Sequence, residues 1–219
     1  IYHDKYTTKL NSYIYYKKII KNNFRESGIK TKEINKLNTF NCGTGLETIV
    51  MQSMGTENNI FCDISQYPID GLNNFIKKKN IKNIATYKQD LCSKKFRIKE
   101  KVNFIYLNGV LHHLYNDKIA FKNLDNLIKE NGKIFFRNYK SGNLRNFVCE
   151  IISKIINFKD SKNFKKNFVR YFGKTELNKN LRFTNFRPGF YESAYDMFFA
   201  PIIKYYNVKQ FINFFKHYN

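Results

Sequence analysis

The sequence of 219 residues contains no apolar run long enough to cross a lipid bilayer. A membrane-spanning helix needs roughly 18 or more consecutive apolar residues, and the longest apolar stretches here are interrupted by Lys or Asn. No signal peptide stands at the start, and the sequence begins with Ile1 rather than Met, so we expect the true N-terminus to be missing. These absences predict a cytoplasmic protein without a membrane span.

Cysteine is sparse, with four residues at positions 42, 62, 92 and 149. No two of them form a Cys-x-x-Cys pair, and no His spacing completes a zinc site. Three of them stand near predicted strand ends, where a small buried residue fits. We therefore expect reduced thiols in the core and no bound metal.

Acidic residues are few, since 17 Asp and Glu stand against 39 Lys and Arg, which gives a net charge of +22. Such an excess favours a polyanionic partner such as nucleic acid. The excess lies mainly in Lys and is accompanied by abundant Asn, a composition that an AT-rich coding sequence also produces. The run Lys77, Lys78 and Lys79 falls on a predicted solvated helix face. A nucleic-acid partner is therefore an alternative rather than the leading interpretation.

Apolar patterning predicts strands and helices in alternation, within a chain that is 42% hydrophobic and long enough for one sizeable core. An N-terminal helical segment ends at Gly28. Strands are predicted at about 36–41, 59–63, 83–88, 102–108 and 133–137, and helices at about 45–55, 66–79 and 117–129, the last ended by Asn131-Gly132. This order predicts an α/β, Rossmann-like, doubly wound and mostly parallel sheet.

The alternation stops after the fifth strand, and residues 141–200 combine helical patterns with many aromatic residues. We interpret this segment as a lid that chooses the substrate, inserted into one domain of 1–219. The remaining parts are an N-terminal helical segment (1–34), a cofactor-binding core (35–140) and a final helix (201–219). Five of the seven arginines follow the fifth strand, which hints at a carboxylate or phosphate partner: Arg137, Arg145, Arg170, Arg182 and Arg187.

Glycine or polar residues follow the predicted strands, where a parallel sheet gathers its carboxyl ends. Gly43 and Gly45 suit a tight strand-to-helix turn at which backbone approaches a ligand. Asp63 is placed to accept both hydroxyls of a ribose, although a helix N-cap would use the same residue. Asp90 either accepts a hydrogen bond from an adenine amino group or forms an ordinary turn. Together they predict a nucleotide-like cofactor.

The glycine spacing excludes two cofactor classes. A dinucleotide fold requires Gly-x-Gly-x-x-Gly, and the third position is occupied by Thr48. No Gly-x-x-x-x-Gly-Lys occurs, so a P-loop is absent as well.

A set of successive motifs completes this pattern: Asn41-Cys42-Gly43-Thr44-Gly45, Cys62-Asp63-Ile64-Ser65, Gln89-Asp90-Leu91 and Asn108-Gly109-Val110-Leu111-His112-His113-Leu114. Over about residues 35–140 the chain resembles the class I S-adenosylmethionine-dependent methyltransferases. The later segment Tyr195–Pro201 is more loosely similar to some bacterial members.

The resemblance implies S-adenosyl-L-methionine as cofactor and assigns a role to each motif. Gly43 and Gly45, with Asn41 and Cys42 before them, would line its methionine part. Asp63 would hold the ribose, Ile64 would flank the adenine, and Asn108 would border the methyl-transfer site. Asp90 and Leu91 would contact the adenine.

Two positions depart from the family pattern. The family usually has an acidic residue where Thr39 stands, which helps to orient the amino group of the cofactor, and a glycine where Asn41 stands. The family sheet also finishes with an antiparallel hairpin, and this sequence stops where that hairpin should begin, so we expect it to be missing. These departures leave open a weakly active or inactive binding or scaffold protein.

Methyl transfer from a sulfonium is an in-line displacement, for which the protein mainly supplies alignment and desolvation. A hydroxyl acceptor also needs a base, and His112 or His113 stands beside the predicted transfer site, with His112 preferred. Both would otherwise cap and pack the following helix. The leading hypothesis is O- or N-methylation of a small molecule. An RNA or tRNA methyltransferase is the alternative, although an Asn-Pro-Pro-Tyr-type motif is absent, since Asn108-Gly109-Val110-Leu111 stands there.

Overall fold

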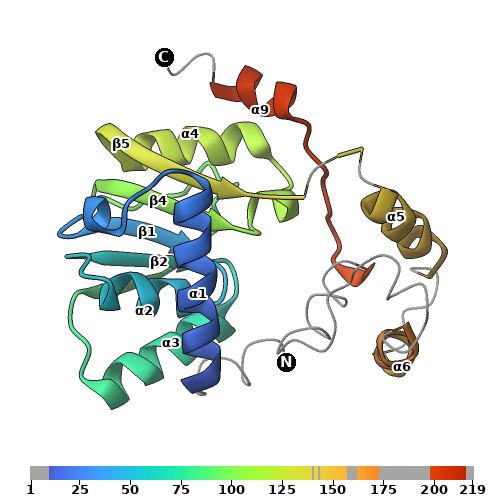
Figure 1. Cartoon of the computed structure of the whole chain (residues 1–219), viewed down its shortest axis with the longest axis horizontal. Coiled ribbons are helices and arrows are strands. Elements are labelled where there is room, and N and C mark those ends of the chain that lie inside the picture. Colours follow the sequence, from blue (N-terminus) through green and yellow to red (C-terminus); the bar gives the residue numbers. More distant parts are fainter. Residues whose placement is uncertain (1–9, 140, 143, 157–161, 173–197, 216–219) are drawn as a thin grey trace. The chain divides into compact units, whose positions relative to one another are not determined.

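The computed structural model of the chain describes residues 10–139, 141–142, 144–156, 162–172 and 198–215 (Figure 1). The chain divides into two compact units, residues 1–137 and 138–219. The division falls close to residue 140, where the sequence predicted the end of the cofactor-binding core. That the whole chain forms a single domain stays a prediction.

The first unit is built on a five-stranded parallel sheet with the strand order β3-β2-β1-β4-β5. Its strands are β1 (Thr39–Cys42), β2 (Asn59–Asp63), β3 (Ile84–Lys88), β4 (Val102–Asn108) and β5 (Ile128–Arg137). From β1 the chain winds outward to β3 on one side and to β5 on the other, so the switch point lies between β1 and β4. Ligands of such sheets bind outside the carboxyl ends of the strands at that point. The doubly wound fold predicted from the sequence is confirmed.

The described part of the first unit also contains four α-helices and two short 3-10 helices, of which α1 and η1 precede β1: α1 (Leu10–Glu26), η1 (Thr31–Ile34), α2 (Leu46–Ser53), α3 (Gln66–Lys79), η2 (Leu111–His113) and α4 (Asp117–Leu127). The predicted bounds of α3 and β4 match the structure residue for residue. The predicted end of the last helix at Asn131-Gly132 is wrong, because α4 ends at Leu127. Ile128 is already extended and pairs with Val102 at the start of β4, so sheet pairing displaces the end of the helix.

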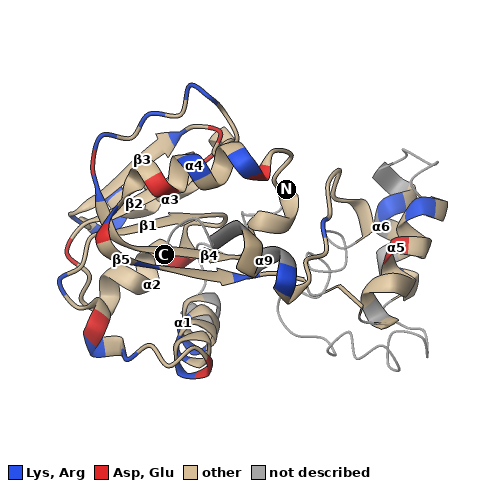
Figure 2. Cartoon of the chain, turned by 90° about the horizontal axis from the view of Figure 1, so that it is seen from above, with Lys and Arg blue, Asp and Glu red and all other residues tan. Residues whose placement is uncertain are grey.

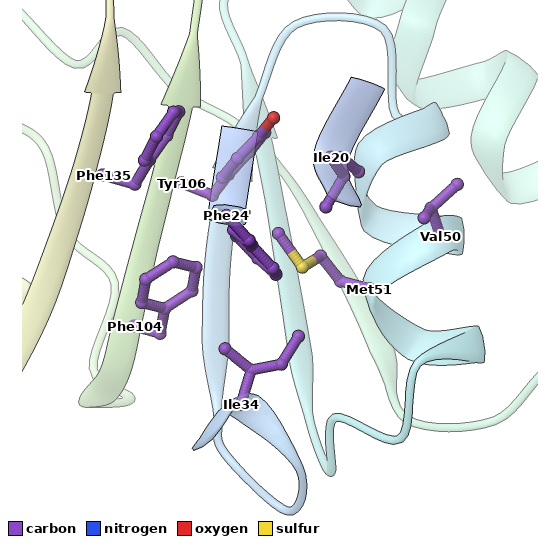
Figure 3. Close-up of a cluster of buried hydrophobic side chains, with 8 residues drawn as sticks. All are labelled: Ile20, Phe24, Ile34, Val50, Met51, Phe104, Tyr106 and Phe135. Atoms are coloured by element: carbon purple, nitrogen blue, oxygen red, sulfur yellow. The ribbon is translucent and has the colours of Figure 1, made fainter. Parts of the chain in front are cut away.

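The helices α1 and α2 cover one face of the sheet through a cluster of buried side chains (Figure 3). The cluster consists of Ile20, Phe24, Ile34, Val50, Met51, Phe104, Tyr106 and Phe135. The rings of Tyr106 and Phe135 stack with their centroids 4.8 Å apart, and Phe24 meets Tyr106 edge-on at 6.0 Å. This packing fixes α1 across β4 and β5, beside the switch point.

The opposite face is covered by α4, whose Phe121 meets Phe136 of β5 edge-on at a centroid distance of 5.9 Å. The buried amide of Asn123 donates to the carbonyl oxygens of Leu91 and Ser93 at 2.8 and 2.9 Å. Burying a polar side chain is favourable only when it is bonded, so this amide ties the loop after β3 to α4.

The described part of the second unit contains α5 (Leu144–Ile156), α6 (Lys162–Phe172) and α9 (Val208–Phe215). Phe168 and Phe172 of α6 pack against Phe198, with centroid distances of 5.4 and 4.9 Å, and Cys149 of α5 belongs to the same cluster. Residues 173–197, which hold most of the predicted aromatic lid, lie outside the described residues. The role of this unit as a lid stays a prediction.

None of the helices that the structure describes has the length and apolar character needed to span a membrane. All four cysteines are free thiols, and three of them are buried.

Candidate cofactor site

The turn between β1 and α2 depends on two glycines with left-handed backbone. Gly43 has φ +107° and Gly45 has φ +78°, values that other residues rarely adopt. A Cβ on Gly45 would lie 3.3 Å from Cδ2 of Leu72, so this glycine allows α2 to approach α3. A Cβ on Gly43 would meet no atom within 4 Å. The backbone at Gly43 therefore borders open space, as a ligand-binding turn requires.

Asp63 ends β2 and lies against this turn. Its Oδ1 accepts the backbone N–H of Ser65 at 2.8 Å, and its carboxylate also receives the backbone N–H groups of Gly43 and Ile64. Burial raises the pKa of Asp63, and these three hydrogen bonds only partly offset that effect. The helix N-cap itself is Ser65, so Asp63 forms the turn before α3 and faces Gly43. The next residue, Ile64, leaves 63% of its surface exposed.

Asp90 lies in the loop after β3 and is linked to Asp63 through Gln89, whose N–H donates to the Asp63 carbonyl at 3.0 Å. Its Oδ1 accepts the N–H of Cys92 at 2.8 Å, as expected of a turn residue. Its Oδ2 accepts the hydroxyl of Tyr115 at 2.6 Å, and this bond raises the pKa of Tyr115 to about 12. Thus the loop after β4, which carries Tyr115, is joined to the loop after β3.

Leu91 follows Asp90, but its side chain is buried in the core. Because its carbonyl accepts the amide of Asn123, the loop is anchored to α4 on the far face of the sheet. A ligand beside Asp90 would meet Leu91 through its backbone rather than through its side chain.

Glu47, in the first turn of α2, is a residue of this edge that the sequence analysis missed. Its side chain is 6% exposed, and its Oε2 accepts the hydroxyl of Thr44 at 2.8 Å. A second hydrogen bond comes from the side chain of Asn108 at the end of β4, while burial raises the pKa of Glu47. The N-cap of α2 is Gly45, so no capping-box signal in the sequence marks Glu47, and its position at this edge depends on the contacts with Thr44 and Asn108.

Thr39 and Asn41 point toward the core of the α2 side rather than toward solvent. Thr39 is fully buried, and its hydroxyl donates to Oδ1 of Asn59 at 2.6 Å. The same oxygen of Asn59 also accepts the hydroxyl of Thr56 at 2.8 Å. Asn41 is 1% exposed and adopts ordinary extended backbone in β1, so no left-handed conformation is needed there. Its Oδ1 has no hydrogen-bond partner among the described residues.

Cys42 is half-buried at the end of β1, beside its register partner Cys62. The hydrogen bond between the two thiols and burial raise the pKa of Cys42 well above its usual range. A thiol held protonated in this way is a poor nucleophile, so Cys42 supports packing of the turn.

The two histidines differ in exposure. His112 is 2% exposed, whereas His113 is half-buried, and their ring centroids lie 4.0 Å apart in η2. Neither caps α4, because the N-cap is Asn116, whose side chain accepts the N–H of Ile119 at 3.2 Å. Burial leaves His112 poorly placed to meet an acceptor from solvent.

The structure thus brings Gly43, Asp63 and Ile64 together, and connects Asp90 to them through Gln89. Asn108 joins the same edge through Glu47. The side chains of Asn41, Leu91 and His112 are buried instead, so these residues belong to the wall behind the site.

Comparisons with known proteins show what this part of the chain resembles. Residues 39–136 match the family model described as a methyltransferase domain. That match includes every strand from β1 to the penultimate residue of β5, and with it all the predicted cofactor-binding residues. A search of the curated proteins gives no significant match.

Among solved structures, PKMT2 from Rickettsia typhi in complex with AdoHcy is similar over 83% of this chain and 38% of its own, with 14% identity and a TM-score of 0.58. TehB from Haemophilus influenzae shares 22% identity over 51% of this chain and 39% of its own, with a TM-score of 0.45. The chain therefore spans less than half the length of these two proteins. The likeness to PKMT2 shows the fold alone.

Proposed function

We propose that this chain belongs to the class I S-adenosylmethionine-dependent methyltransferases and transfers a methyl group to a small molecule, because residues 39–136 match a methyltransferase domain. The cofactor of this family is S-adenosylmethionine. The observation that carries the proposal is the Asp63 carboxylate, which lies against the backbone N–H of Gly43 at the carboxyl edge of the sheet. An acidic side chain and an open glycine turn are what an adenosyl group needs at one place.

The residues present fit the cofactor. Gly43 leaves open space beside the turn, and Asp63 would bind the ribose through its carboxylate. Ile64 offers exposed apolar surface next to it, where an adenine ring would be flanked. Asp90 would accept from the adenine amino group, since a carboxylate that already takes two hydrogen bonds retains further acceptor positions.

When bound, S-adenosylmethionine supplies a methyl group that is already activated on a sulfonium. The chain then has to orient the acceptor and exclude water. Asn108, at the end of β4, would border the acceptor. For a hydroxyl acceptor the base would be His113 rather than the His112 preferred from the sequence, because His113 is partly exposed and His112 is buried.

The charge distribution gives no specific support to an RNA substrate. Lys and Arg are spread over several helices and loops of the first unit (Figure 2). The densest predicted run, Lys77, Lys78 and Lys79, ends α3. A crossover helix runs back from the carboxyl edge to the amino edge of a parallel sheet, so this run lies at the edge opposite the cofactor site.

Calorimetric titration with S-adenosylhomocysteine tests cofactor binding directly. We expect wild-type protein to bind, and Asp63→Asn to weaken binding about 10-fold or more, since hydrogen bonds to a charged group contribute roughly 1.5–3 kcal/mol. Asp125→Asn, an exposed acid on α4, is the matched control and should bind like wild type. No binding to wild-type protein at millimolar ligand would instead favour a scaffold that has lost the cofactor.

A methyl-acceptor screen with labelled S-adenosylmethionine tests the substrate class. Small molecules, RNA and protein extracts are offered in parallel, and transfer only to macromolecules would overturn the small-molecule assignment. We also expect the protein in the cytoplasm, a location with which its free thiols agree.

A further inference from the structure

Glu47 is a buried carboxylate that lacks a cationic partner. The chain contains 39 Lys and Arg, yet within the described residues no ion pair reaches this side chain. The charges of Glu47 and Arg137 both affect the pKa of Tyr106. The guanidinium of Arg137 nevertheless forms its hydrogen bond with Oδ1 of Asn23 and not with Glu47. Buried charges are normally paired, so Glu47 requires an explanation.

The donors that Glu47 does have are neutral. The backbone N–H of Glu47 itself, the hydroxyl of Thr44 and the side chain of Asn108 satisfy three of roughly four acceptor positions on the carboxylate. None of them supplies a positive charge, and burial accordingly raises the pKa of Glu47. Within the described residues the site thus lacks a positive charge to balance this carboxylate.

A second acceptor stands on the same face of the sheet. Asn41 is the register partner of Tyr106 in the neighbouring strand. Burial and the negative charge of Glu47 both raise the pKa of this tyrosine, so Glu47 lies near it. The Oδ1 of Asn41 is buried and has no donor among the described residues. Unpaired buried acceptors are rare, so the free Oδ1 of Asn41 and the uncompensated carboxylate of Glu47 together indicate a ligand that carries N–H groups and a positive charge.

The position of Glu47 identifies that ligand group. Thr44 directly follows Gly43 of the open turn, and Asn108 ends β4, so Glu47 joins the two ends of the site where the amino-acid part of the cofactor would lie. We propose that Glu47 binds the ammonium group of the methionine tail of S-adenosylmethionine, an inference that rests on the proposed function. The described residues contain no group of three or more His, Cys, Asp and Glu that would hold a metal ion there instead.

Glu47 also stabilises the turn before α2 by accepting the hydroxyl of Thr44, and the test has to separate the two roles. Glu47→Gln preserves this role, because the amide oxygen of Gln accepts the same hydrogen bond. It removes only the negative charge. The two probes are S-adenosylhomocysteine, which carries the ammonium tail, and 5′-methylthioadenosine, which has the same adenosine without that tail.

We expect Glu47→Gln to lower the affinity for S-adenosylhomocysteine about 10- to 100-fold and to leave that for 5′-methylthioadenosine within about twofold, as measured by calorimetry. Asp63→Asn should weaken both ligands by the same factor, because it contacts the shared ribose. Equal effects of Glu47→Gln on both ligands, or no effect on either, would overturn the assignment while leaving the proposed function intact. Failure of wild-type protein to bind either ligand would overturn both.

A measurement on wild-type protein keeps the inference testable if the variant does not fold. S-adenosylhomocysteine acetylated at its amino group retains every other part of the ligand but cannot carry the positive charge. We expect it to bind at least about 10-fold more weakly than the parent compound. Equal affinity of the two compounds would show that no carboxylate receives the ammonium group.

Discussion

Replacing Gly43 by Ala should separate the binding role of the glycine turn from its structural role. The backbone at Gly43 has φ +107°, which a side chain rarely tolerates, so the substitution costs about 1–3 kcal/mol of folding free energy as strain. The new methyl group meets no atom within 4 Å, so no steric clash within the chain adds to this cost. For a domain of this size such a loss lowers the melting temperature by about 2–12 °C.

The methyl group would instead occupy the open space beside Asp63, which the cofactor needs. We therefore expect Gly43→Ala to bind S-adenosylhomocysteine at least about 10-fold more weakly, which corresponds to roughly 1.4 kcal/mol. Gly45→Ala is the matched control. Its φ of +78° imposes similar strain, but its methyl group points at Leu72, 3.3 Å away, inside the helix packing.

Urea unfolding and calorimetric titration of both variants provide the comparison. The expected result is destabilisation of both proteins, larger in Gly45→Ala because its methyl group crowds Leu72, with ligand affinity lost in Gly43→Ala and kept within about threefold in Gly45→Ala. If both variants retained wild-type affinity, or if Gly45→Ala lost as much as Gly43→Ala, the open side of the turn would not be the ligand site.

Three further outcomes follow from individual contacts. Tyr106→Phe should reduce the unfolding free energy by about 1–3 kcal/mol in urea titrations, because the buried amide of Asn23 loses the hydroxyl that accepts its hydrogen bond at 2.7 Å; an unchanged midpoint would contradict this. Glu47 has a pKa raised by burial, so the folded protein binds more protons than the unfolded chain and its stability falls as pH rises through the folded pKa. Glu47→Gln removes this dependence, and its stability relative to wild type should increase with pH across that range. Tyr115→Trp creates the sole tryptophan of the chain, and its fluorescence should change when S-adenosylhomocysteine binds beside Asp90; a constant signal would argue against adenine at that loop.

Most of the fold could be predicted from the sequence because its signals are local. The bounds of α3 and β4 follow from apolar periodicity within each segment, and the structure reproduces them. The end of α4 could not be predicted in this way. The helix ends before the local stop signal Asn131-Gly132, because Ile128 pairs with Val102 in the sheet and these two residues lie far apart in the sequence.

The predicted site follows a similar division. Asp63 and Gly43 could be placed together from the sequence alone, because parallel strands end at one edge whatever their separation along the chain. Glu47 and Tyr115 could not, because their functions depend on contacts with Asn108 and Asp90 across the edge. Sequence spacing brings the strand ends to one edge, but it does not say which side chains of the different loops meet there.

The sequence by itself thus determined the alternation of strands and helices, the glycine turn and the acidic strand ends, since each depends on neighbouring residues and on the regular geometry of a parallel sheet. Only the tertiary structure decided that His112 is buried while His113 is half-buried, that Thr39 bonds to Asn59, and that a carboxylate of α2 reaches the end of β4. The physical reason is that burial and hydrogen-bond partners are set by packing between distant segments, and packing exists only once those segments have come together.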